Sequence, residues 1–319
     1  MGGEMRIGKI LRMGAGIAVG GILLWFIGDG VYAWRVGSKA KAADAPRSGG
    51  ATETLHRGGE PAVLMIHGFA DGPAIFEYMG PALADQGMEV RLMRLEGFGG
   101  TLEEAAQVTL EAWRRDIDAE IAGLKAEMPS REVWLVGHSL GGTLAFDAAL
   151  RPENGVAGLL LLAPFLEASR TRSPVLAPRR WFEILDRLLV FTQVIESILP
   201  RDIHNPEMRG YVTDRYLHRA LYRALFAATD AIQGRAADWH GPLWMCIATE
   251  DLVVDSRASE RFFFAATNAQ PARLVSAYAA GHVLPLDYGW ERLAERMGTF
   301  IRGEAGNSAV RDAIGGGGD

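Results

Sequence analysis

Cysteine is almost absent from this sequence, since Cys246 is the single thiol among 319 residues. No intramolecular disulfide can form, and because Cys246 lies in an apolar run we expect a small buried side chain. No cluster of Cys and His at zinc-binding spacing occurs, so no metal is expected. Positive charge is in the minority, and the formal net charge of -6 argues against a general nucleic-acid binder.

Apolar residues are plentiful, at 49% of the chain against 23% charged residues. One domain with an insertion fits this length and composition better than two equal domains. Apolar runs of strand type alternate with helical runs, and several are apolar on both faces, as in a buried parallel sheet. We expect strands at 62–66, 89–95, 132–136, 156–162, 243–248 and 272–277, and helices at roughly 75–86, 103–127 and 142–150. The pattern predicts a doubly wound α/β fold over residues 61–302, with helices on both faces of a mostly parallel sheet.

The N-terminal segment combines a basic start with an apolar run. Three Lys and Arg residues precede an uncharged stretch over 13–27, and Asp29 is the one charge between that stretch and Trp34. At about 1.5 Å per residue, such a helix could span a bilayer. We predict that residues 1–36 form an uncleaved, single-pass membrane anchor. A cleaved signal peptide, giving a secreted or periplasmic protein, and a buried or interfacial helix are the alternatives. Basic residues lie on both sides, so the side of the membrane stays open.

Three further segments depart from the alternation. Residues 37–60 have no periodicity and are predicted to be a linker, and residues 303–319 a disordered tail. Residues at about 165–240 contain two apolar stripes of helical period, within 181–199 and 216–228. They predict two amphipathic helices, with no strand between them, forming a cap over the C-terminal edge of the sheet. Packing against the flank of the sheet is the alternative.

A serine flanked by glycines lies where a strand-like run meets a small-residue helical stretch, in Gly137-His138-Ser139-Leu140-Gly141-Gly142. The spacing G-x-S-x-G is typical of a nucleophile elbow, in which a strained turn exposes the serine hydroxyl beside a helix N-terminus. An ordinary Gly-rich turn is the alternative. We predict that Ser139 is a nucleophile.

A serine nucleophile needs a histidine base, and that base needs an orienting carboxylate. His282 sits in a turn just past the run at 272–277, so it should project above the same sheet edge as Ser139. His138 is expected to point away from the nucleophile and to pack. Asp251 follows the run at 243–248 most closely and is the predicted carboxylate. Asp255, a candidate helix N-cap, and Glu250 are the alternatives. The remaining histidines in the linker and cap are expected at the surface or as caps: His56, His204, His218 and His240.

A tetrahedral intermediate also needs hydrogen-bond donors for its oxyanion. The strand at 62–66 runs into His67-Gly68-Phe69. The backbone N–H groups of Phe69 and Leu140 are the predicted oxyanion donors, each worth roughly 3 kcal/mol of transition-state stabilisation.

Together these motifs resemble the α/β-hydrolase superfamily, and most closely bacterial carboxylesterases and monoacylglycerol lipases, which are grouped with serine aminopeptidase-like hydrolases. The resemblance rests on five segments in family order: His67-Gly-Phe, the stretch from Arg94 to Thr101, Gly137-His-Ser-Leu-Gly-Gly, Glu250-Asp251-Leu and Gly281-His282-Val. It implies the triad Ser139, Asp251 and His282, the oxyanion amides of Phe69 and Leu140, and a helical cap after the sixth strand of the fold. The sequence departs from the family at Glu96 and Phe98, where R-x-P-G-H-G is usual.

These observations predict a serine hydrolase that cleaves esters of acyl or lipid-like substrates and needs no cofactor. An acyltransferase, or an amidase or peptidase, could use the same triad and is the alternative. A non-catalytic, membrane-tethered binding module is a further alternative, although no triad member is missing. Acyl length and oligomeric state are left open.

Overall fold

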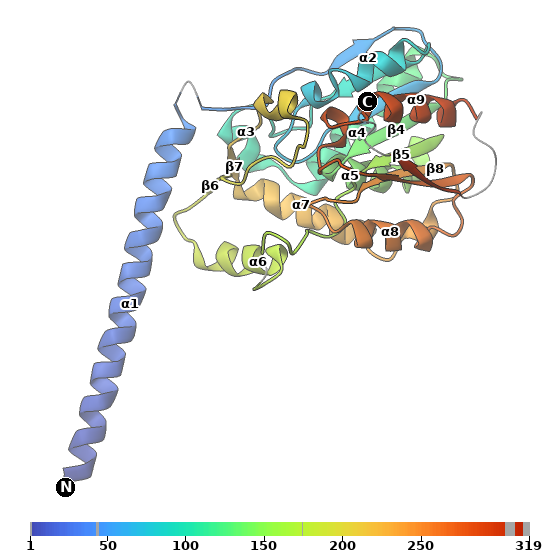
Figure 1. Cartoon of the computed structure of the whole chain (residues 1–319). Coiled ribbons are helices and arrows are strands. Elements are labelled where there is room, and N and C mark those ends of the chain that lie inside the picture. Colours follow the sequence, from blue (N-terminus) through green and yellow to red (C-terminus); the bar gives the residue numbers. More distant parts are fainter. Residues whose placement is uncertain (1, 43–44, 174, 304–309, 315–319) are drawn as a thin grey trace.

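The computed structural model describes residues 2–42, 45–173, 175–303 and 310–314 (Figure 1). Within these residues, an eight-stranded sheet has the order β1-β3-β2-β4-β5-β8-β9-β10. Its strands are β1 (Glu53–Leu55), β2 (Ala62–Ile66), β3 (Glu89–Met93), β4 (Val133–His138), β5 (Gly158–Leu162), β8 (Leu243–Ala248), β9 (Ala272–Ala277) and β10 (Val310–Ile314). All neighbours pair in parallel except β1, which is antiparallel to β3.

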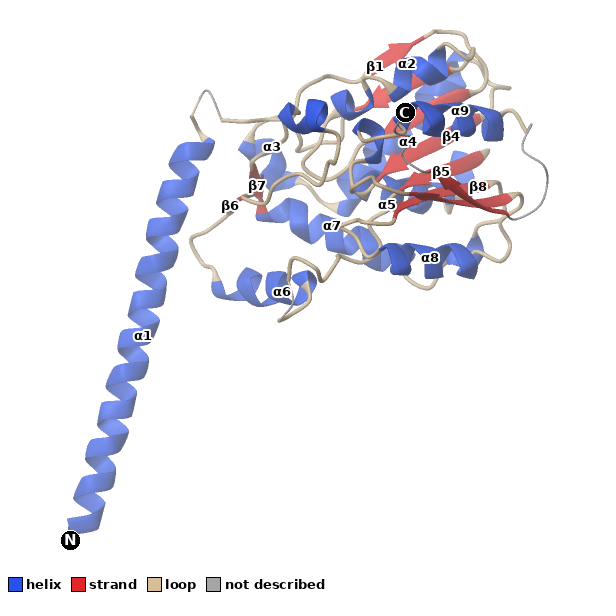
Figure 2. Ribbon diagram, in the orientation of Figure 1, coloured by secondary structure: helices blue, strands red, loops and turns tan. Residues whose placement is uncertain are grey.

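Helices cover both faces of this sheet (Figure 2). The helices next to the sheet are α2 (Met79–Ala84), α4 (Leu110–Glu127), α5 (Leu140–Ala149), α8 (Ser256–Ala265) and α9 (Trp290–Ile301), whereas α3 (Leu102–Gln107) contacts the insertion. α2 packs against α9, and α5 packs against α4 and the central strands. Every residue of β2, β4, β5 and β8 is buried, because both faces of these strands are covered. The predicted doubly wound α/β fold is confirmed.

The N-terminal segment is a long helix, α1 (Gly2–Ala40), that projects away from the body over much of its length (Figure 1). In the part of the chain that the structure describes, no helix has both the length and the apolar character to cross a membrane. The prediction of a transmembrane anchor is therefore not supported. Asp29, which interrupts the apolar run, is buried, and its carboxylate accepts hydrogen bonds from backbone N–H groups of the insertion at residues 190–192.

The prediction of a linker over 37–60 is wrong in two places. The first four residues of this range continue α1, and residues 53–55 form the edge strand β1. Between them Ser48 is buried, and its N–H donates to the carboxylate of Asp214 at 2.9 Å. Tertiary contacts thus order a stretch whose composition is that of a loop.

The predicted disordered tail also contains a strand. Val310–Ile314 pairs in parallel with β9 as β10. The segment Val310–Ile314 is short and does not alternate between apolar and polar residues, so its sequence does not distinguish a strand from a loop. Residues 304–309 and 315–319 lie outside the described residues.

The insertion between β5 and β8 has two layers and more structure than expected. It contains α6 (Pro178–Leu188), β6 (Val194–Glu196), β7 (Tyr216–His218) and α7 (Arg219–Ile232). α7 is the inner layer and packs against α5, whereas α6 has no buried residue (Figure 2). The prediction of no strand between the two helices is wrong, because β6 and β7 pair antiparallel. Asp29 binds the backbone just after α6, and a contact between segments so far apart in the chain leaves no mark in the local pattern.

Candidate active site

Ser139 lies on a sharp turn between β4 and α5. Its φ of 54° falls in the left-handed region that a non-glycine residue rarely adopts. A side chain at Gly137 would collide with the carbonyl of Gly141, and one at Gly141 would collide with the carbonyl of Ile66. The two glycines of G-x-S-x-G therefore allow the close approach that this turn requires. The predicted elbow geometry is present.

The structure brings the three predicted catalytic side chains together. The Oγ atom of Ser139 lies 2.9 Å from Nε2 of His282. Nδ1 of His282 lies 2.8 Å from Oδ2 of Asp251. The second oxygen of Asp251 accepts hydrogen bonds from the N–H groups of Val253 and Val254, both at 2.8 Å. The carboxylate is thus fixed on both sides, and an Nδ1–H on His282 leaves Nε2 free to accept the serine proton.

The two other acids weighed for this role lie elsewhere. Asp255 is the N-cap of α8 and accepts hydrogen bonds from the N–H groups of Arg257 and Ala258. The sequence predicts a helix N-cap for Asp255 if it is not the triad acid, and the structure places it at such a cap. Glu250 is exposed in the turn after β8.

The loop after β2 lies beside the serine. A Cβ added to Gly68 would lie 3.2 Å from Cβ of Ser139, which places the backbone of Phe69 next to the nucleophile. Among the described residues, the N–H groups of Phe69 and Leu140 have no hydrogen-bond partner. Leu140 is the first residue of α5, where a backbone N–H is left without an intrahelical acceptor. Both groups remain able to donate to an oxyanion.

Two buried histidines support these loops. Nε2 of His67 accepts the N–H of Leu95 at 3.1 Å, and burial lowers the pKa of His67 to about 4. Nε2 of His138 lies 3.0 Å from the carbonyl oxygen of His282 and donates to it. Burial, assisted by the neighbouring His282, lowers the pKa of His138 to about 3. His138 was expected only to pack, but it also holds the backbone of the predicted base.

The departure at Phe98 has a structural explanation. The Phe98 ring is buried and contacts three aromatic rings, those of His67, Phe69 and Trp113, at centroid distances of 5.5, 5.4 and 5.9 Å. An apolar ring here extends the hydrophobic wall beside the oxyanion loop. On the side facing the insertion, Phe69 also packs against Tyr222 of α7, at 4.8 Å.

Two aspartates that the sequence did not identify hold the His282 loop. Oδ2 of Asp202 accepts the N–H groups of Leu252, at 2.7 Å, and His282, at 3.0 Å. Asp287, which is fully buried, accepts the N–H of Gly281 and, from the insertion, the N–H of Asn205, both at 2.8 Å. Asp287 lies five residues after His282, so its proximity in the sequence could have marked it. Asp202 lies in the insertion, where no motif marks it.

The arrangement is suited to nucleophilic acyl transfer. It combines a serine on a strained turn, a histidine with a fixed carboxylate, and two free N–H donors. Among the residues that the structure describes, no group of three or more His, Cys, Asp or Glu side chains could hold a metal ion. Cys246 is buried, and burial raises the pKa of its thiol.

Comparison with known proteins agrees with this geometry. Residues 59–287 match the family model described as Serine aminopeptidase, S33. The thermostable monoacylglycerol lipase of Bacillus sp. (strain H-257) is 26% identical over 270 residues, which cover 82% of this chain and 98% of that relative. α1 lies outside the matched family region.

Solved structures share the fold. The monoglyceride lipase of Saccharomyces cerevisiae, solved with a substrate analogue, has a TM-score of 0.68 at 15% identity, covering 78% of this chain and 90% of that one. The monoacylglycerol lipase of Paleococcus ferrophilus has a TM-score of 0.65 at 18% identity, covering 80% and 98%.

Proposed function

Because the chain belongs to the serine aminopeptidase, S33, family and is an α/β-hydrolase of the esterase and lipase type, we propose that it cleaves monoacylglycerol-like esters through an acyl-enzyme. The observation that carries this proposal is the hydrogen-bonded series Ser139–His282–Asp251, with distances of 2.9 and 2.8 Å. The similar monoacylglycerol lipase of Bacillus supports the choice of substrate.

The reaction would proceed in two halves. His282 takes the proton of Ser139 as the hydroxyl oxygen attacks the ester carbonyl, and Asp251 stabilises the resulting imidazolium. The N–H groups of Phe69 and Leu140 donate to the oxyanion of the tetrahedral intermediate. His282 then returns the proton to the leaving alcohol, and the acyl group stays on Ser139. Water attacks this acyl-enzyme with His282 again as base, the carboxylic acid leaves, and the serine regains its proton.

The surroundings of the site favour hydrophobic substrates. The Phe69 loop carries an aromatic side chain packed between Phe98 and Tyr222, and Tyr222 in turn stacks on Phe182 of α6 at 5.5 Å. Apolar walls that bury the acyl part contribute binding energy through removal of apolar surface from water. An ester with a hydrocarbon acyl chain therefore suits this side of Ser139.

The test is ester hydrolysis by the full chain and by Ser139→Ala. Wild-type protein should hydrolyse monoacylglycerols and 4-nitrophenyl esters and should react with a fluorophosphonate probe. The Ser139→Ala variant should lose both turnover and labelling while keeping its urea-unfolding midpoint. Labelling that persists in this variant would contradict the role of Ser139.

Ester hydrolysis and acyl transfer differ only in the acceptor. Adding an alcohol or amine to the ester assay and measuring transfer products separates them. We expect the free acid to be the main product. A dominant transfer product would favour an acyltransferase, and cleavage of 4-nitroanilides in place of esters would favour an amidase or peptidase.

A further inference from the structure

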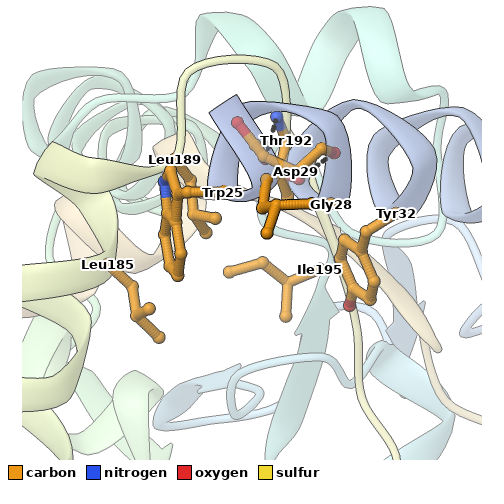
Figure 3. Close-up of a pocket in the computed structure, with 9 residues that line it drawn as sticks. Trp25, Gly28, Asp29, Tyr32, Leu185, Leu189, Thr192 and Ile195 are labelled. Carbon is orange, nitrogen blue, oxygen red and sulfur yellow. Dashed lines mark hydrogen bonds between the residues drawn. The ribbon is translucent and has the colours of Figure 1, made fainter. Parts of the chain in front are cut away.

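A groove lies between α1, which is outside the family region, and the insertion (Figure 3). We call it the α1–cap groove; its volume is about 400 Å³. Its apolar lining comes from Leu24, Gly28 and Tyr32 of α1 and from Leu185, Leu189 and Ile195 of the cap. Pockets of about 300–1,000 Å³ hold small-molecule ligands in many proteins. Leu24 is 71% exposed, so the groove opens to solvent on one side.

Specific polar contacts hold α1 against the cap. The carboxylate of Asp29 accepts the N–H groups of Val190, Phe191 and Thr192 at 2.7, 2.8 and 3.1 Å. The Thr192 hydroxyl donates to the same carboxylate at 2.6 Å. The indole N–H of Trp25 donates to the carbonyl of Leu188 at 3.1 Å. Four donors on one buried carboxylate fix the position of α1 against the cap, so the two walls of the groove are held in place.

The chemistry of the lining selects its occupant. Four lining side chains carry a polar group, and Asp29, Thr192 and Trp25 use theirs in the contacts between α1 and the cap. The Tyr32 hydroxyl is the fourth, and the rest of the lining is aliphatic apart from Gly28. Such a surface has little to offer a charged or sugar-like ligand and favours a hydrocarbon chain.

The groove is next to the aromatic residues that lead to the serine. Leu185 in its wall lies one helical turn after Phe182, and Phe182 stacks on Tyr222. Tyr222 packs on Phe69, whose backbone is beside Ser139. A series of packed aromatic side chains therefore joins the wall of the α1–cap groove to the apolar wall of the active site.

We propose that the α1–cap groove binds the distal part of the substrate's acyl chain, so that the N-terminal helix forms part of the substrate site. This inference rests on the proposed ester hydrolase function, and it adds that α1 sets the preference for long chains. A short acyl group would end at the Phe69–Tyr222–Phe182 cluster and would not reach α1.

Gly28→Leu is the decisive variant. Gly28 lines the groove, and a Cβ added there meets no atom within 4 Å, so a leucine side chain can start from this position without a clash at its first atom. Gly37→Leu is the matched control, because it makes the same change in the same helix, also with no atom within 4 Å of the added Cβ. Nine residues at about 100° each put Gly37 on the opposite side of the helix from Gly28. Leucine is a better helix former than glycine, so neither change weakens α1.

Kinetics of the full chain with 4-nitrophenyl esters of four to sixteen carbons give the first test. Burial of each methylene is worth roughly fourfold in affinity, and leucine displaces several, so Gly28→Leu should lower kcat/KM for the longest ester on the order of 100-fold. The shortest ester should change less than about threefold with Gly28→Leu, and every ester less than about threefold with Gly37→Leu. Equal losses for short and long esters, equal losses in the two variants, or no loss would overturn the proposal.

Photolabelling tests the groove without turnover. A palmitic acid that carries a diazirine at its chain end is irradiated with Ser139→Ala protein, and the labelled peptides are mapped by mass spectrometry. Labels at residues 24–32 or 185–195 that disappear in the Ser139→Ala/Gly28→Leu protein are expected. Labels elsewhere would overturn the groove assignment even if ester hydrolysis is observed. Groove labelling in a protein that hydrolyses no ester would refute the proposed function but would still support the groove as a binding site for an acyl chain.

Discussion

Replacing Asp202 with alanine is expected to lower kcat more than the affinity for substrate. Oδ2 of Asp202 accepts hydrogen bonds from the N–H groups of Leu252 and His282, at 2.7 and 3.0 Å. Leu252 follows Asp251 directly, so this single oxygen joins the two loops that carry the acid and the base of the proposed triad. The Asp202 side chain is buried, which makes loss of its charge-assisted bonds costly.

The magnitude follows from these two bonds. A hydrogen bond to a charged group contributes roughly 1.5–3 kcal/mol, so Asp202→Ala, which removes two, should lose about 3–6 kcal/mol of unfolding free energy. Release of the His282 backbone also displaces the imidazole, and a misplacement of about 1 Å costs on the order of 100-fold in kcat. Asp202→Asn keeps a carbonyl oxygen as acceptor but not the charge, and it should recover about tenfold of that loss.

Steady-state kinetics with a monoacylglycerol, together with urea unfolding, measure both effects. Asp214→Ala is the matched control, because the Asp214 carboxylate is also buried in the cap and accepts two backbone N–H groups, from Ser48 and Gly99, at 2.9 and 2.8 Å. It should lose similar stability while kcat of the folded protein changes less than about threefold. Equal losses of kcat in the two folded alanine variants, or no recovery with asparagine, would refute the positioning role.

Three further predictions concern the triad, the core and pH. Asp251→Asn should lower kcat on the order of 10⁴-fold at nearly constant KM, because an amide favours the wrong tautomer of the base. Glu89→Gln, measured by urea unfolding, should cost about 3–5 kcal/mol because it breaks a buried ion pair with Arg131, at 2.6 Å. Burial lowers the pKa of His67 to about 4 and of His138 to about 3, from 6.5, so the unfolded chain binds more protons below pH 6.5. Unfolding free energy should therefore be retained at pH 7 and fall between pH 7 and 5 by about 2 kcal/mol for each histidine. In the His138→Gln variant the unfolding free energy should fall by about 2 kcal/mol less over the same pH range. An unchanged pH dependence in this variant would contradict the lowered pKa of His138.

Local sequence was sufficient for the central strands and for the position of the candidate site. β2 and β8 have the predicted bounds, because buried parallel strands are apolar on both faces. Ser139, Asp251 and His282 each follow such a strand, and parallel strands direct their C-terminal ends to one edge of the sheet. Three residues far apart in the chain could therefore be grouped from the sequence alone.

Contacts between distant segments account for the features that the sequence did not predict. β6 and β7 have three residues each, and their pairing depends on a long loop between them. The N–H groups of residues 190–192 bind Asp29, which lies more than 160 residues earlier. In the local sequence Asp29 is a charge that interrupts an apolar run, and its partners could not be identified from periodicity. The partners of Asp202 could not be identified from the local sequence either, because they lie in two loops that follow 50 and 80 residues later.

The attachment of the cap to the catalytic loops restricts how a substrate can enter. Through Asp202 and Asn205 the inner part of the cap is bonded to the His282 loop. Lifting the whole cap would break these bonds and displace the base, so the inner part of the cap stays in place while the triad is intact. α6 is the outer layer of the cap, because none of its residues is buried. The segment that Asp29 holds begins two residues after α6 ends. A helix outside the family region is thus bonded to the outer layer of the cap, where Trp25 donates to the carbonyl of Leu188.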